Sequence, residues 1–138
     1  MIKHPFLDIE YKPTIRGIIG AFDIYDREHT LGIELEKYDM DIASDRKALA
    51  KIYIANNSEH LSYRHKFLLV TTLRNALLDK FFDFKALLEH DCESTNSFPV
   101  DCDNMKNPRA FFEDIFSVLV TEWEDELQSA GLEDQSTW

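Results

Sequence analysis

A chain of 138 residues, of which 44% are hydrophobic and 12% aromatic, is long enough to bury one core, and this composition excludes the disordered class. The formal net charge of −11 and the pI near 4.8 argue against nucleic acid or an anionic membrane as a direct ligand, because phosphate groups bind to basic surfaces. We therefore expect a protein whose charged partners, if it has any, are basic.

The chain is interpreted as a single domain over residues 1–138, because it contains no internal repeat, low-complexity tract or Gly/Ser-rich linker. Its first residues lack the apolar stretch and cleavage site of a signal peptide, and no apolar run approaches the length that spans a bilayer. We therefore expect a cytoplasmic protein without a membrane partner. Both cysteines, Cys92 and Cys102, lie in one polar stretch, and in that compartment their thiols are expected to be reduced.

The first third of the chain fits helices best but allows a second interpretation. Its apolar residues recur at steps of three and four after Thr14, a good N-cap residue. Leu31, Ile33 and Leu35 also alternate with polar or small residues, which leaves a small β-hairpin at residues 18–38 as the alternative. The residues at helical spacing are Ile15, Ile18, Ile19, Phe22, Tyr25, Leu31, Leu35, Tyr38 and Ile42.

Two further helical regions are predicted in the middle of the chain, the first at residues 44–56. Residues 58–91 contain neither Gly nor Pro, and one helix of that length would measure about 50 Å, which is long for a domain of this size. We expect two helices, or one bent helix, that begin after Ser58 as the N-cap and break at residues 79–83. The apolar stretch at residues 67–73 indicates a central position in the core. The face of the first helix that is expected to be buried consists of Ala48, Leu49, Ile52 and Tyr53.

The last helix has the clearest pattern. Asn107 is a suitable N-cap, Pro108 occupies a first-turn position that tolerates proline, and Gly131 is a C-terminal stop. Between them, a broad apolar stripe recurs at helical spacing. With these elements the sequence predicts an all-α fold, a single-domain bundle of about five helices. The stripe consists of Phe112, Ile115, Phe116, Leu119, Val120, Trp123 and Leu127.

Negative charge is concentrated in the last third of the chain. Residues 91–138 contain 12 acids and 2 bases, whereas residues 41–90 contain 6 acids and 8 bases. In one helix that ends at Gly131, several of these acids would lie near the C-terminus, where the helix dipole disfavours anions. This placement indicates that the acids serve a contact outside the helix. Such charge asymmetry can mark an interaction surface.

An aromatic residue at the end of the sequence accompanies these acids. Trp138 lies beyond Gly131 in a tail that is expected to be mobile, and such a side chain suits insertion into a cleft of a partner. Trp123, in contrast, belongs to the apolar stripe and is expected in the core. The predicted partner-binding residues are Glu122, Glu124, Asp125, Glu126, Glu133, Asp134 and Trp138.

The sequence contains no recognisable catalytic or cofactor motif, so we predict no catalytic residue, no cofactor and no metal ion. His60 and His65 are five residues apart, and a helix would point them away from each other. One loop contains His, Cys and Asp, the residue types that bind zinc, but the spacing of these residues is not that of a common zinc module. The residues of that loop are His90, Cys92 and Cys102, with a nearby aspartate. The bases expected to pair with acids elsewhere in the fold are Arg64, Lys66 and Arg74.

In its size, its acidic charge and the surface sequence EWEDELQSAGLEDQ, the chain resembles the immunity proteins of bacterial toxin systems, including those of colicins and of contact-dependent growth inhibition. The resemblance covers these general properties and no sequence motif. Many of these toxins are nucleases with basic clefts. The resemblance therefore implies an acidic binding protein that neutralises a basic partner by covering the active cleft of a cognate nuclease toxin.

Two other classes of protein remain as alternatives. The first is a metal-dependent hydrolase with a site assembled on facing helices, which would normally show paired Glu-x-x-His steps. The chain contains no such step, and we expect it not to be an enzyme. The second is a helical adaptor or dimerisation protein, in which the acidic residues are only solvated. Nucleic-acid mimicry by an unrelated regulator would produce the same acidic surface as an immunity protein.

Overall fold

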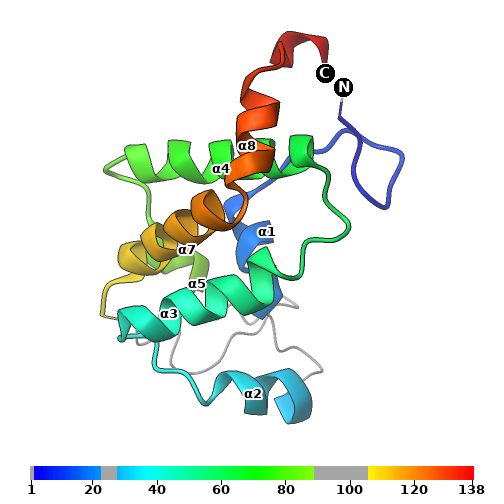
Figure 1. Ribbon diagram of the computed structural model, residues 1–138. Coiled ribbons are helices and arrows are strands. Elements are labelled where there is room, and N and C mark those ends of the chain that lie inside the picture. The colour runs from blue at the N-terminus through cyan, green and yellow to red at the C-terminus, as the bar shows by residue number, and fades with distance from the viewer. Residues whose placement is uncertain (1, 23–27, 89–105) are drawn as a thin grey trace.

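The computed structural model of the protein describes residues 2–22, 28–88 and 106–138 (Figure 1). Within these ranges the chain forms seven α-helices and no strand, and the bridge between Lys3 and Glu10 is isolated. The predicted all-α class is therefore confirmed. The described parts of residues 18–38 are helical or in turns, which excludes a hairpin there. The number of described α-helices exceeds the predicted five, in part because the helix predicted over residues 107–131 is divided into two.

Two short helices form the N-terminal third. α1 (Ile15–Ile19) begins after Thr14, whose Oγ1 accepts a hydrogen bond from the backbone N–H of Gly17 at 3.0 Å, so the predicted N-cap is confirmed. The 3-10 turn η1 (Gly20–Phe22) continues this helix, and η2 (Glu28–Gly32) leads into α2 (Ile33–Leu35). The predicted helical spacing is confirmed only in part, because Ile42 is 47% exposed and Tyr25 lies outside the described residues. The predicted residues that are buried are Ile15, Ile18, Ile19, Phe22 and Leu35.

The next helix changes its winding halfway. α3 (Ala43–Leu49) continues into η3 (Ala50–Ala55), so the helix predicted at residues 44–56 is confirmed. Because η3 is a π-helix, its hydrogen bonds span five residues and its buried face shifts. The predicted burial of Ile52 is wrong, since this side chain is 44% exposed. The buried residues follow the five-residue step instead and are Leu49, Ala50, Ile54 and Ala55.

The middle of the chain forms α4 (Tyr63–Leu78) and α5 (Phe84–Leu88), which confirms the break predicted at residues 79–83. The start of α4 was predicted too early, because Ser62 and not Ser58 is the N-cap. The Oγ of Ser62 accepts from the N–H of His65 at 3.4 Å, and the N–H of Ser62 donates to Nδ1 of His65 at 3.2 Å. The hydroxyl of Ser58 is buried and donates to the backbone carbonyl three residues earlier.

The single C-terminal helix predicted over residues 107–131 is wrong. α7 (Pro108–Glu122) begins after Asn107, as predicted, and α8 (Glu124–Gly131) continues in a different direction (Figure 1). Trp123 separates the two helices, with φ of −106° and ψ of 19°. Its side chain is only 4% exposed, so the indole is held in the core as predicted. The chain turns at this residue, and α8 packs against α4.

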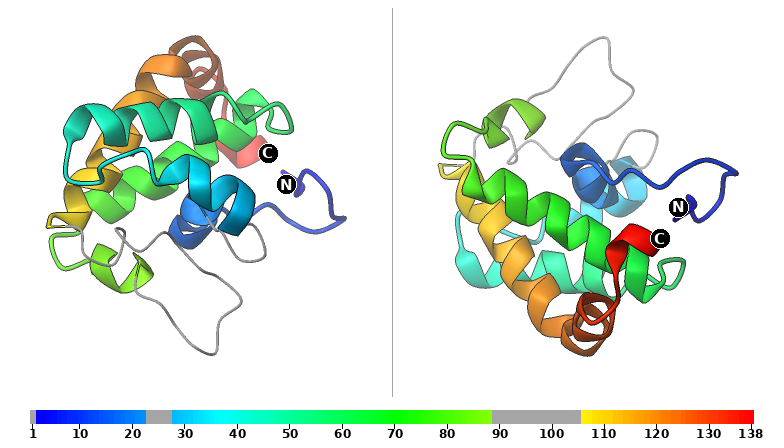
Figure 2. Two further views of the ribbon diagram at one scale, coloured as in Figure 1. Left: turned by 90° about the horizontal axis from the view of Figure 1, so that it is seen from below. Right: turned by 90° about the horizontal axis from the view of Figure 1, so that it is seen from above.

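Figures 1 and 2 show α7 at the centre of the fold. α4 lies on one side of α7, and α3 with η3 lies on the other, whereas α8 crosses α4. A largely buried ion pair between Arg46 Nε and Asp114 Oδ2, 2.7 Å apart, joins α3 to α7. The first described residues and the last residues of the chain lie close together near the start of α4. Both ends of the chain are therefore positioned by the same helix.

Replacing Leu119 with Ala should destabilise the fold strongly, because this residue lies on the buried face of α7. Its side chain is fully buried, so the substitution leaves a cavity and should lower the free energy of unfolding by about 2–5 kcal/mol. Leu132→Ala is the matched control, since that side chain is 90% exposed and should change stability by less than about 0.5 kcal/mol. Urea unfolding followed by circular dichroism measures both variants. Equal losses of stability in the two variants would contradict the central position of α7.

Candidate functional site

The acids at residues 124–126 lie at the start of a helix and not near its end. Glu124, Asp125 and Glu126 occupy the first turn of α8, which begins directly after Trp123. A helix N-terminus carries the positive end of the helix dipole and stabilises an anion by about 0.3–1 kcal/mol. The prediction that these acids oppose a helix dipole is therefore wrong, and that argument for an external partner no longer applies to them.

Three of the predicted partner-binding acids form ion pairs with bases of the same chain. These pairs confirm that Arg64 and Lys66 bind acids elsewhere in the fold, whereas Arg74 has no ion pair among the described residues. Each pair joins α7, α8 or the C-terminal tail to an earlier element. The three pairs are Glu122–Lys51 at 3.6 Å, Glu126–Lys66 at 2.6 Å and Glu133–Arg64 at 2.5 Å.

Lys66 is the most buried of these three bases. Its side chain is 10% exposed, whereas that of Glu126 is 43% exposed. The Nζ atom of Lys66 also lies 5.3 Å from the centre of the Trp123 ring, which is a cation–π distance. A buried ammonium without a partner is strongly destabilising. Glu126 therefore fastens α8 to α4, and a partner that engages its carboxylate would compete with this internal contact.

The C-terminal tail is packed against α4 and is not the mobile segment that the sequence predicted. Asp134 Oδ1 accepts a hydrogen bond at 3.0 Å from the backbone N–H two residues later and caps the 3-10 turn η4 (Gln135–Thr137). The ring of Trp138 lies edge-on to Phe67, with ring centres 5.6 Å apart. The guanidinium carbon of Arg64 lies 5.5 Å from the centre of the Trp138 ring. Trp138 is thus partly covered by its own fold.

Arg64 also binds the carboxylate of Glu133. Its Nε and Nη2 atoms donate to one oxygen of Glu133, at 3.0 Å and 2.5 Å. The hydrogen bonds from Arg64 lower the pKa of Glu133. The pKa of Asp134 is lowered as well, by its hydrogen bonds from Ser136. Both tail acids are therefore held ionised, and Arg64 binds the carboxylate and the terminal ring together.

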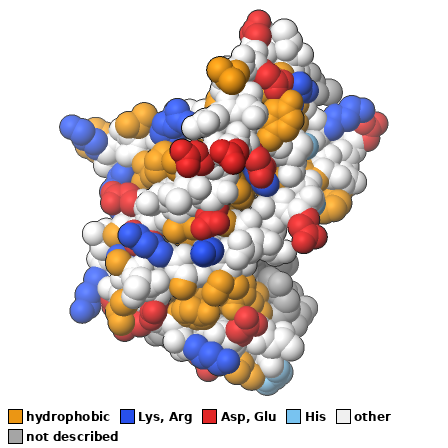
Figure 3. Space-filling view, viewed as in Figure 1, with side chains coloured by type: hydrophobic (Ala, Val, Ile, Leu, Met, Phe, Trp, Pro, Cys, Tyr) orange, Lys and Arg blue, Asp and Glu red, His pale blue; other side chains and the backbone are white. Residues whose placement is uncertain are grey.

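Glu124 and Asp125 are the predicted partner-binding residues that stay exposed and form no ion pair or hydrogen bond with the rest of the described chain. Glu124 borders a groove of about 420 Å³ between α4, α7 and α8. Figure 3 shows acidic side chains beside apolar ones where α7 meets α8. The groove also has Arg74 and Gln128 at its edge. Its apolar walls consist of Phe67, Val70, Phe116, Val120 and Leu127.

Sequence reasoning missed this groove because it placed Phe116, Val120 and Leu127 in the core. Helical spacing shows which side chains share a face, but it does not show how much of that face a neighbouring element covers. In the structure α8 turns away after Trp123 and leaves part of the stripe open, so that Val120 is 37% exposed. The sequence carries no local signal for the groove, because neither Gly nor Pro marks the turn at Trp123 that opens it.

The part of the chain that the structure describes shows neither a metal centre nor a helix that could cross a membrane. No three His, Cys, Asp or Glu side chains in it are grouped to hold a metal ion, and none of its helices combines the necessary length with apolar character. His90, Cys92 and Cys102, the weak zinc candidates, lie outside the described residues. Comparison with protein-family models, curated proteins and solved structures finds no match to this chain.

Replacing Glu126 with Gln should cost far more stability than the same change at Glu124. Glu126→Gln removes the carboxylate that faces Lys66 and should lower the free energy of unfolding by about 1–3 kcal/mol. Glu124→Gln is the matched control in the same helical turn, because it removes only a dipole interaction of about 0.3–1 kcal/mol. Urea unfolding of both variants measures the difference. Equal costs would mean that the Lys66 pair does not fasten α8.

Lowering the pH should loosen the contact that holds the Trp138 ring against α4. Because Arg64 lowers the pKa of Glu133, their contact is fully present above the ordinary glutamate pKa of about 4.3 and is lost as the pH falls through the lowered value. The indole N–H resonance of Trp138 should therefore stay unchanged through that ordinary value and move only at lower pH. In Glu133→Gln the part of this transition that comes from the Arg64 contact should be absent, and only the part that comes from the neighbouring Asp134 should remain. A wild-type transition centred at the ordinary glutamate pKa would contradict the Arg64 contact in solution.

Proposed function

We propose that the protein binds a basic protein partner through the start of α8 and the adjoining groove. The observation that supports this proposal is the unpaired carboxylate of Glu124 at the border of a largely apolar groove of about 420 Å³, followed in the same helical turn by the exposed carboxylate of Asp125. Apolar contacts that exclude water provide most of the affinity of such surfaces, whereas charged groups at the rim set the orientation and the rate of encounter. A basic partner with one apolar side chain seated in the groove would engage both features.

The most specific form of this proposal is an immunity protein that covers the active cleft of a cognate nuclease toxin. A nuclease cleft is basic because it binds phosphates. Residues 106–138, which form α7, α8 and the tail, contain eight acids and two bases, and such a field favours rapid capture of a basic surface. In this role the protein acts in the cytoplasm, catalyses no reaction, and binds neither nucleic acid nor a membrane directly.

The charges that border the groove favour one orientation of a bound segment. Arg74 borders it on α4, and Glu124 borders it on α8. A partner segment with a base near Glu124 and a carboxylate or carbonyl group near Arg74 would fit in one orientation, and the reversed segment would bring like charges together. The alternative, a helical adaptor, is favoured by two apolar residues at the end of α4 and in the connection that follows it. There Leu78 and Phe81 are 73% and 94% exposed, which is typical of contact sites.

Affinity capture at low salt from the organism that encodes the chain should recover a basic protein, and raising the salt should weaken its retention. The double variant Glu124→Gln/Asp125→Asn should associate with that protein about tenfold more slowly at low salt, with the deficit shrinking as salt screens the wild type. Stopped-flow mixing of the purified pair measures the rate. If the captured protein is a nuclease, addition of the wild-type chain should suppress its cleavage of nucleic acid.

The matched control is Glu36→Gln/Glu113→Gln, which changes the net charge equally, directly after α2 and in α7. If both double variants associate equally slowly, net charge alone acts and α8 is not the contact. Capture that yields only copies of this chain would favour the adaptor over a basic partner. A captured nuclease that stays active in the complex would exclude the immunity role while leaving the basic-partner proposal standing.

A further inference from the structure

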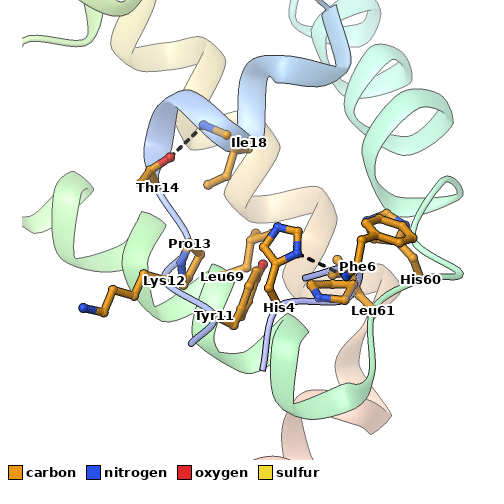
Figure 4. Close-up of a pocket in the computed structure, with 12 residues that line it drawn as sticks. His4, Phe6, Tyr11, Lys12, Pro13, Thr14, Ile18, His60, Leu61 and Leu69 are labelled. Atoms are coloured by element: carbon orange, nitrogen blue, oxygen red, sulfur yellow. Dashed lines mark hydrogen bonds between the residues drawn. The ribbon is translucent and has the colours of Figure 1, made fainter. Parts of the chain in front are cut away.

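A second pocket lies on a different face of α4, under the N-terminal segment. Its volume is about 370 Å³, within the range of small-molecule sites. Figure 4 shows that the N-terminal segment, α1, α4 and the connection before α4 all contribute to it. Among the described residues, no Asp or Glu side chain lines this pocket, although the chain has a formal net charge of −11. It therefore differs in chemistry from the acidic surface of α8.

The pocket is held open by contacts of the N-terminal segment with itself and with α4. The N–H of His4 donates to the carbonyl of Ile9 at 2.8 Å, so the segment forms a closed loop. Nδ1 of His65 accepts from the N–H of Ser62, so the ring proton must lie on Nε2, which donates to the carbonyl of Lys3 at 2.6 Å. Because the loop is fastened to α4 before any ligand arrives, binding would cost little ordering entropy.

Two side chains in this pocket are hydrogen-bond donors that have no acceptor among the described residues. Nδ1 of His4 accepts from the N–H of Phe6 at 3.1 Å, which places the proton of the neutral ring on the free Nε2. The hydroxyl of Tyr11 is the second donor, and burial raises its pKa, so it stays protonated. The ring centres of His4 and Tyr11 lie 6.3 Å apart, and Figure 4 shows the two side chains next to each other.

The rest of the lining is mainly apolar or weakly basic. Ile18, Leu61 and Leu69 form an aliphatic wall, and His60 stacks on Phe6 with ring centres 5.4 Å apart. Lys12 also borders the pocket, with its ammonium directed away from His4 and toward Glu10, 3.5 Å distant. A ligand that matches this lining needs two adjacent acceptor atoms and an apolar body. A negative charge on the acceptors would meet no carboxylate in the lining.

From these contacts we propose that the pocket binds a small organic carboxylate. Its two oxygens accept hydrogen bonds from Nε2 of His4 and from the hydroxyl of Tyr11, and its apolar body lies against Ile18, Leu61 and Leu69. The carboxylate is favoured over a neutral amide because charge-assisted hydrogen bonds are the stronger ones, and an amide also presents an N–H group for which the lining side chains offer no carboxylate acceptor.

Titration of the ¹⁵N-labelled protein with phenylacetate tests this site, with phenylacetamide and benzylamine as probes of the same size. Phenylacetate should shift the amide resonances of Thr14, Gly17 and Leu61, and its Kd should be at least about tenfold lower than those of the other two probes. Equal Kd values for phenylacetate and phenylacetamide, tighter binding of benzylamine, or no shifts with phenylacetate would each overturn the proposal. This comparison uses the unmodified protein and does not depend on any partner of α8.

Tyr11→Phe removes the hydroxyl donor and keeps the ring, so it should raise the Kd of phenylacetate about tenfold. Tyr38→Phe is the matched control and should leave that Kd unchanged, because Tyr38 does not line this pocket. A Tyr11→Phe protein that keeps the wild-type amide spectrum and binds phenylacetate with unchanged Kd would contradict the role of the hydroxyl.

Discussion

The contact of Lys66 with Glu126 and Trp123 determines how the C-terminal third sits on the rest of the protein. The ammonium of Lys66 is almost entirely buried, and desolvation of such a charge costs several kcal/mol unless the charge is paired. Glu126 provides the opposite charge at 2.6 Å, and the face of the Trp123 ring adds a cation–π contact. These contacts require α8 to lie across α4. The position of α8 then sets the groove, the exposed acids and the place of the tail.

This geometry divides the C-terminal acids into two kinds. Glu126 and Glu133 hold α8 and the tail onto α4 through Lys66 and Arg64, whereas Glu124 and Asp125 have no such partner among the described residues. Glu126 and Glu133 would have to leave Lys66 and Arg64 before their carboxylates could bind another protein. Glu124 and Asp125 can bind a basic side chain of another protein without the loss of an internal contact. Of the six acids that the sequence predicted to bind a partner, Glu124 and Asp125 at the start of α8 are the ones we propose to do so.

The helices could be predicted from the sequence because their signals are local. Thr14 and Asn107 cap helices through hydrogen bonds that span three residues, and apolar spacing within α7 identifies the side that faces the core. The break at Trp123 has no such signal, since neither Gly nor Pro interrupts residues 109–130. It arises because the indole stays in the core while Glu126 reaches Lys66, a residue 60 positions away in the chain. A pairing between two residues so far apart in the chain cannot be predicted from local sequence patterns.

Because such distant contacts cannot be predicted from local patterns, neither pocket could be predicted from the sequence. Phe116 and Val120 have the spacing of core residues, and only the turn at Trp123 leaves them partly uncovered. His4 and Tyr11 match no motif, and they come together because the N-terminal segment closes on itself and is fastened to α4 by His65. The identity of each residue was visible in the sequence. Its availability to a ligand depends on contacts that the folded chain makes elsewhere.

Internal ion pairs change the local chemistry of the acidic surface but not its long-range field. Each pair is neutral as a unit, so the formal net charge of −11 remains to act at a distance on an approaching partner. At contact distance, however, the partner meets only those carboxylates that lack an internal base, together with the apolar wall of the groove. Encounter and recognition therefore depend on different residues. In the complex that we propose, total charge governs the rate of encounter, and Glu124, Asp125 and the side chains left open by the turn at Trp123 govern recognition.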